Sequence, residues 1–319
     1  MSSGKTVLII GGSGFLGTQL ALRLRETTKV FATYHRNPIR IPGVTPLPMN
    51  LADLDWVKRS IYTVGPDAVV YAVGTNNLWQ AQLQSKEQEQ LQVGALAPVL
   101  KASTIFQPRF VYLSSAYAFD GIRGNYREQD TVLSALALGK VKIEAENFVR
   151  GRALHYSVVR SSPVIARGCG GNLSFFDRLR IRLSRGLKTG VDATELHSFT
   201  HMNPFLDLVE RIIESGPRNQ VHHLGGLTKC TYFDLSKAIA QRLGLDAGLL
   251  YPLPREQSST RVLDQAKWDF SLNSTESIRN LRVTPLLLEE LVERLAEEAI
   301  TSGTGPEVRV RAPSPGASI

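Results

Sequence analysis

A glycine-rich stretch near the start of the chain has the composition of a phosphate-binding loop. In LIIGGSGFLGTQLALRL, Gly11, Gly14 and Gly17 follow an apolar run and open a helical pattern. Glycines in that context let backbone N–H groups approach a pyrophosphate, and the helix dipole favours its charge. Gly17 would let the helix pack closely on the strand. The stretch predicts a dinucleotide site; the alternative is a tight turn without a ligand.

The end of the second predicted strand indicates which dinucleotide binds. An acidic residue there would bind the adenosine ribose and repel a 2′-phosphate. The segment KVFATYHRNPIR has no acid and instead carries His35, Arg36 and Arg40. These residues favour NADP(H) over NAD, although Arg36 alone is also typical of an exposed loop.

Further motifs occur in a recognisable order: PDAVVYAVGTNN, VYLSSAYAFDG followed by NYREQD, and HSFTHMNPFLDLVERI. Together with the glycine loop they resemble the extended short-chain dehydrogenase/reductase family. Within it, the chain is most similar to the dTDP-4-dehydrorhamnose reductase branch, which is related to the NAD-dependent epimerase/dehydratases. The resemblance implies cofactor contacts from Gly11, Ser13, Gly14, Phe15, Leu16, Gly17, His35, Arg36, Ala72, Val73, Gly74 and Lys142.

Catalysis in this family needs a Ser or Thr hydroxyl on the carbonyl, a proton-passing Tyr, a Lys that lowers the Tyr pKa and an Asn that positions the Lys. The resemblance places Ser115 and Lys142 at two of these positions. The Tyr position is Leu138, one helical turn before Lys142 and therefore on the same face. The Asn position is assigned to Gly94, and Ala116 replaces a frequent acid. The usual proton relay is predicted to be incomplete.

Other residues could replace the missing acid or bind the substrate. Tyr117 is the first choice for a relocated acid, because it lies two residues after Ser115 and on the same side if the strand continues. The family resemblance and this argument together give the predicted substrate contacts: Ser115, Tyr117, Arg160, Asn172 and His197. Tyr126 and Glu195 are weaker alternatives, and Cys169, without a neighbouring His pattern, is expected to be inert.

Short β-branched runs alternate with helical stretches through the first half of the chain. This alternation predicts an α/β fold with a doubly wound parallel sheet, the Rossmann fold. We expect residues 1–165 to form the dinucleotide-binding domain. Residues 166–300, which open with the glycine cluster RGCGGN, should complete the sheet and form a smaller substrate-binding cap. Residues 301–319 are rich in Gly, Pro and Ser and are expected to be a disordered tail.

The composition limits the function classes. The chain has 319 residues, 43% hydrophobic and 21% charged, and only two cysteines, which lack metal-ligand spacing. No apolar run approaches the ~20 residues of a membrane span, and the start does not read as a signal peptide. A cytoplasmic protein without a metal is expected. The net charge of +8 is densest in DRLRIRLSRGLK, which favours a solvated helix face over a pyrophosphate-facing helix; nucleic-acid binding is not predicted.

Three functions remain open. The first is an NADP(H)-dependent reductase acting on a nucleotide-sugar-like or other polar carbonyl substrate with a non-standard acid. The second is a catalytically silent dinucleotide-binding subunit with a partner enzyme, as the regulatory subunit of methionine adenosyltransferase suggests by family analogy. The third is a non-redox lyase or isomerase. The expected partners are a small-molecule substrate and either a partner enzyme or a second copy of the chain.

Overall fold

The computed structural model describes residues 4–75, 78–253, 268–300 and 309–310. Its centre is a seven-stranded sheet in the order β12-β7-β6-β5-β1-β2-β4, and every neighbouring pair is parallel. The strands are β1 (Thr6–Ile10), β2 (Lys29–Tyr34), β4 (Val44–Pro48), β5 (Ala68–Tyr71), β6 (Arg109–Ser115), β7 (Tyr156–Ser161) and β12 (Gln220–Leu224). The predicted doubly wound sheet is confirmed.

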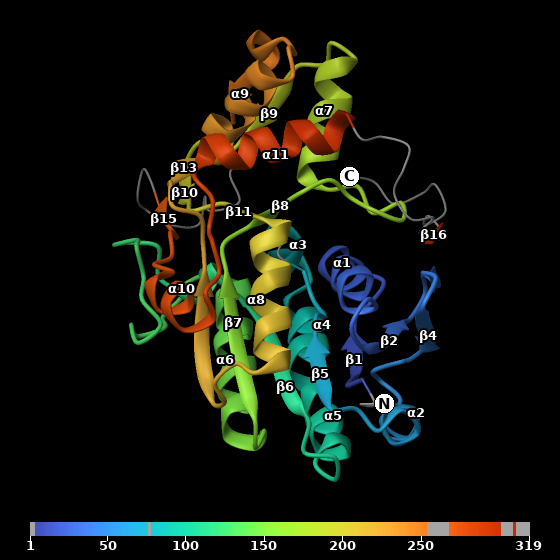
Figure 1. The fold of residues 1–319 in the computed structure, drawn as a ribbon. Coiled ribbons are helices and arrows are strands. Elements are labelled where there is room, and N and C mark those ends of the chain that lie inside the picture. The colour runs from blue at the N-terminus through green and yellow to red at the C-terminus, as the bar shows by residue number, and fades with distance from the viewer. Residues whose placement is uncertain (1–3, 76–77, 254–267, 301–308, 311–319) are drawn as a thin grey trace.

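Helices cover both faces of this sheet (Figure 1). Side chains alternate along β1, so Val7 and Ile9 pack in one core cluster and Leu8 and Ile10 in the other. The first face is covered by α1 (Phe15–Leu24) and α8 (Met202–Glu214), and the second by α2 (Leu54–Val64), α5 (Leu96–Ser103) and α6 (Ala137–Arg152). Burial on both faces explains why these strands are almost continuously apolar.

Local residues explain the ends of α2 and the position of β4. The Asp53 side chain caps the N-terminus of α2, and Gly65 closes its C-terminus at φ +54°. Strand β4 contains Pro46 and Pro48, which lack the N–H that a central strand needs. They are tolerated because β4 is the edge strand of the sheet.

The helical stretch before β6 is broken. It consists of α4 (Ser85–Glu89), a π-helical turn η1 (Gln90–Gly94) and α5. A short helix, α3 (Leu78–Leu83), precedes it. The break lies where the sequence places Gly94 and Pro98, both poor helix-interior residues.

A second layer lies above the sheet in Figure 1 and consists of α7 (Phe175–Ser184), α9 (Tyr232–Arg242) and α11 (Leu288–Ile300). These helices share a core that includes Phe176, Leu235 and Leu295. Capping boxes fix the first turns of α7 and α9. The short elements around this cap are β8 (Val164–Ile165), β9 (Thr189–Val191), β10 (Glu195–His197), β11 (Thr200–His201), β13 (Cys230–Thr231), η3 (Ala247–Leu249), β14 (Leu250–Pro252), β15 (Trp268–Asp269) and α10 (Thr275–Leu281).

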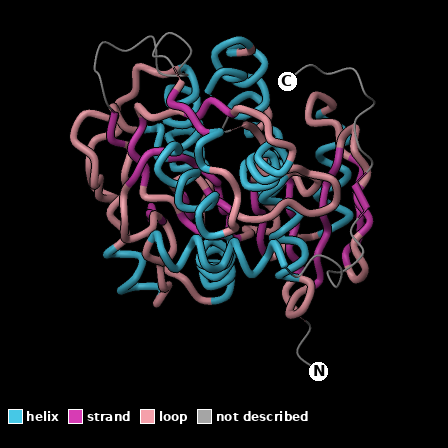
Figure 2. The backbone as a smooth tube through the Cα atoms, turned by 90° about the horizontal axis from the view of Figure 1, so that it is seen from above, coloured by secondary structure: helices cyan, strands magenta, loops and turns pink. Residues whose placement is uncertain are grey.

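The second half of the chain contributes to both layers. Figure 2 shows the molecule from above, with helices around the strands. The expected tail differs at two residues, because β16 (Arg309–Val310) pairs antiparallel with β3 (Ile39–Arg40). The other residues of that tail lie outside the described part of the chain. Among the described helices, none is long and apolar enough to cross a bilayer.

Candidate functional site

The glycine loop lies where β1 and β5 end side by side, at the point where the strand order reverses. Gly11 has φ +88°, and a Cβ there would lie 2.8 Å from the Ala72 carbonyl oxygen. A Cβ at Gly17 would lie 2.2 Å from the Gly11 oxygen, so the close packing predicted for this glycine is confirmed. The switch point of such a sheet is the usual site of ligand binding.

The N-terminus of α1 points its backbone donors at this crevice. Gly14 is the N-cap and offers no side-chain cap, and the first turn contains no acid. Phe15 and Leu16 begin the helix directly after Ser13 and Gly14. Uncapped N–H groups without a neighbouring carboxylate suit an anion, so the residues present fit a pyrophosphate.

The exit of β5 forms the opposite wall. Ala72 donates its N–H to the Ile10 oxygen at 2.9 Å, and Val73 and Gly74 follow. Gly74 has φ +121°, and a Cβ there would collide with the Gln92 side chain. Ala72 and Val73 therefore border Gly11, and Gly74 packs against Gln92.

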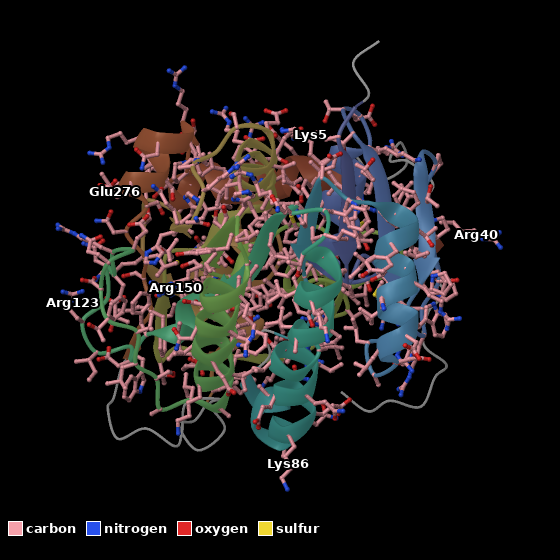
Figure 3. All side chains as sticks on the ribbon, turned by 90° about the horizontal axis from the view of Figure 1, so that it is seen from below. Lys5, Arg40, Lys86, Arg123, Arg150 and Glu276 are labelled. Atoms are coloured by element: carbon pink, nitrogen blue, oxygen red, sulfur yellow. The ribbon has the colours of Figure 1, made fainter. Side chains whose placement is uncertain are left out.

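The adenosine corner follows β2. His35 and Arg36 come directly after this strand and are exposed. Arg40 extends outward from the neighbouring β3 (Figure 3). This corner therefore carries exposed basic side chains and no acid at the end of the strand.

The strand that carries Ser115 ends at that residue. A 3-10 turn, η2 (Ala116–Ala118), follows, so the expectation that Tyr117 shares the side of Ser115 on a continuing strand is wrong. The Ser115 hydroxyl accepts a weak local hydrogen bond of 3.4 Å from the Tyr117 N–H. Ser115 itself is 3% exposed.

Tyr117 is instead part of a buried polar cluster with His197. Its hydroxyl donates to Glu195 at 2.7 Å and lies 3.4 Å from Nε2 of His197, which is itself 3.0 Å from Glu195. Burial, followed by the negative charge of Glu195, raises the Tyr117 pKa well above its ordinary value. Two predicted substrate residues are thus brought together, with Glu195 between them.

Leu138 and Lys142 lie one turn apart in α6, as predicted, and both are buried. Leu138 is 1% exposed and packs in an apolar cluster with Leu78, Ala81 and Leu136. The Lys142 ammonium donates to the Leu113 oxygen at 3.1 Å. Burial lowers its pKa to about 8, although nearby Glu146 opposes this shift.

Two other predicted substrate residues have structural contacts. Arg160 is 2% exposed and pairs with Glu146 at 2.7 Å, and Glu146 also accepts from the Ser114 hydroxyl. We therefore reassign Arg160 from substrate contact to a structural role. Asn172 donates from Nδ2 to the Ser13 oxygen at 3.0 Å, which places it against the glycine loop.

Sequence reasoning assigned the Asn position to Gly94, which is exposed. The side chain buried beside the site is Gln92, which is 0% exposed and lies against Gly74. Its Nε2 bonds Gln88 at 3.0 Å, and its Oε1 has no partner among the described residues. Gln92 and Gly94 both lie in the π-helical turn η1.

The family model described as the RmlD substrate binding domain matches residues 5–286. The chain belongs to this family. The resemblance to dTDP-4-dehydrorhamnose reductase-like proteins is therefore confirmed.

The chain is similar to methionine adenosyltransferase 2 subunit beta of Bos taurus. The two are 27% identical over 260 residues, which cover 78% of this chain and 75% of that protein. The dTDP-4-dehydrorhamnose reductase of Bacillus anthracis, solved with NADP, has a TM-score of 0.77 and 19% identity, covering 92% and 99% of the two chains. The enzyme WbmG of Bordetella bronchiseptica, solved with NAD and UDP, has a TM-score of 0.76 and 14% identity, covering 95% and 96%. These structures share the fold.

Proposed function

We propose that this chain is a dinucleotide-binding protein that lacks the reductase proton relay and serves as a regulatory or partner subunit of another enzyme. The observation that carries this proposal is the burial of Leu138 in an apolar cluster, one turn before Lys142. A nicotinamide supplies a hydride when bound, but carbonyl reduction also needs a proton donor. Leucine cannot donate one, and the Tyr117 hydroxyl is engaged by Glu195.

The binding half of the proposal is supported by the glycine loop. Gly11 and the start of α1 would hold the pyrophosphate, and Lys142 would hold the nicotinamide ribose. His35 and Arg36 favour NADP(H) over NAD, because the Arg36 charge and the His35 ring N–H would complement a 2′-phosphate.

The partner half is supported by the relatives. The cattle protein is named as a subunit of a methionine adenosyltransferase. We infer that the partner of this chain is an enzyme of that class and that the two proteins associate in the cytoplasm.

Binding and hydride transfer can be tested separately. Purified protein should bind NADPH more tightly than NADH and show no oxidation of NADPH with nucleotide 4-ketosugars. Gly11→Ala should abolish binding, because the new Cβ would collide with Ala72. Gly151→Ala is the matched control, since a Cβ there meets no atom within 4 Å.

Partnership is tested by mixing the protein with a methionine adenosyltransferase catalytic subunit. A co-eluting complex with altered transferase kinetics is the expected result. Measurable NADPH oxidation together with no complex would contradict the proposal.

A reductase with a different acid is the second candidate, favoured by Lys142. Its pKa of about 8 makes the ammonium a better proton donor than an ordinary lysine. In that case the turnover of NADPH would be lost in Lys142→Met and reduced in Ser115→Ala. Turnover that survives both substitutions and Tyr117→Phe would exclude these residues.

A further inference from the structure

The glycine cluster RGCGGN forms a short segment, residues 167–172, that we call the strap. It touches the glycine loop and its helix at both ends. Asn172 Nδ2 donates to the Ser13 oxygen at 3.0 Å, and Gln19 Nε2 donates to the Arg167 oxygen at 3.3 Å. Segments some 150 residues apart in sequence are joined here, as the sequence separations of 159 and 148 show.

The strap is preformed by its own sequence. Gly170 and Gly171 have φ of +62° and +89°, a conformation that side chains rarely adopt. A Cβ at Gly168 would lie 1.8 Å from the backbone oxygen of Asn172. The Gly168 N–H donates to the Asp177 carboxylate at 2.7 Å. Asp177 belongs to the capping box of α7. The conformation of the turn itself therefore places the Asn172 side chain at the Ser13 carbonyl.

The other side of the strap is fixed to the cap. The Arg167 N–H donates to Glu298 of α11 at 2.8 Å. The same carboxylate lies 3.0 Å from Nε2 of His201, which is 1% exposed and caps α8. Glu298 thus holds the strap, α8 and α11 together.

We propose that Asn172 is a positioning residue of the dinucleotide site, which holds the strap closed on the glycine loop and slows the release of bound dinucleotide. Because the Ser13 carbonyl accepts the hydrogen bond from the Asn172 amide, this carbonyl oxygen cannot turn toward an anion at the start of α1. Glu298 acts one step further away by anchoring the strap. The inference rests on the proposed function in one respect, that the chain binds a dinucleotide.

The test is the dissociation rate of NADPH, followed by stopped-flow fluorescence with the full chain. Asn172→Ala should raise that rate by about 3- to 10-fold, the usual effect of one hydrogen bond. Asn172→Asp should raise it further, because a carboxylate cannot donate and repels both the carbonyl oxygen and the phosphates. The association rate should change by less than about twofold, since the glycine loop is intact.

Glu298→Gln should raise the same rate by a smaller factor, with Glu297→Gln as its matched control because Glu297 pairs at the surface with Arg294. Thermal unfolding without NADPH separates positioning from structure: a lower melting temperature with an unchanged dissociation rate would overturn the inference. Unchanged kinetics in Asn172→Ala would overturn it while leaving the proposed function intact. No NADPH binding by the unmodified protein would overturn both.

Discussion

The Tyr117 hydroxyl donates a 2.7 Å hydrogen bond to the Glu195 carboxylate inside the protein. The two residues belong to different parts of the chain, η2 beside the sheet and β10 beneath the cap. Because burial and the carboxylate both raise the Tyr117 pKa, this phenol keeps its proton. Its hydroxyl links the two layers by bonding to Glu195.

Tyr117→Phe should therefore reduce stability. The variant leaves the buried carboxylate with one donor fewer, and a bond to a charged group contributes about 1.5–3 kcal/mol. Urea unfolding measures the loss. Tyr251→Phe, at a side chain that is 45% exposed, is the control and should change stability by less than ~0.5 kcal/mol. Equal stabilities of the two variants would contradict the importance of this bond.

Arg160→Met should destabilise the fold by about 3–5 kcal/mol, because it leaves Glu146 as a buried charge without its partner. Chemical unfolding followed by circular dichroism gives the value. Arg123→Met is the matched substitution at an exposed ion pair with Asp130, where a loss below ~1 kcal/mol is expected. A small effect at Arg160 would restore the earlier view that this arginine faces a substrate.

Lys142 gives the folded protein a distinctive response to alkaline pH. Its folded pKa of about 8 lies below the ordinary 10.5, so the unfolded chain binds more protons between these values. The contribution of Lys142 to the free energy of unfolding should then increase by up to ~3 kcal/mol as the pH rises from 8 to 10.5. Below pH 8 the buried ammonium is charged and destabilises the fold by the full amount. Without dinucleotide, urea unfolding of the unmodified protein and Lys142→Met should diverge accordingly.

The neighbouring Lys140 provides the control for this measurement. It is exposed and two residues away in the same helix. Lys140→Met should follow the unmodified protein at every pH. A Lys142→Met profile that runs parallel to the unmodified protein would show that the ammonium titrates as in water.

Leu138→Tyr should restore a phenol at the family position but reduce stability by about 1–3 kcal/mol, because the surrounding apolar cluster is already filled. Thermal unfolding measures the cost. Leu154→Tyr, at a position that is 54% exposed, controls for the substitution itself. A fully stable Leu138→Tyr variant would indicate spare room around this side chain.

Local patterns were sufficient to predict the sheet and the glycine loop. Alternating apolar runs and helices specify β1, α1 and their neighbours, and the glycine spacing predicts a turn whose positive φ at Gly11 the structure contains. The end of α2 at Gly65 is local in the same way, because this glycine takes the left-handed conformation. These features depend on residues close together in the sequence.

The partners of the candidate site residues could not be predicted, because they depend on contacts between distant segments. Tyr117 meets Glu195, which is 78 residues away, and Asn172 meets Ser13 across 159 residues.

The π-helical turn at Gln90–Gly94 has a consequence for how this chain can accept changes in length. Such a turn holds one more residue than an α-helical repeat, and each α-helical residue corresponds to a rotation of about 100°. Deleting a single residue there would let α4 and α5 merge into one regular rod. The amide of Gln92 would then rotate away from the residues that follow β5. This short turn therefore sets how far α5 is rotated about the helix axis relative to α4.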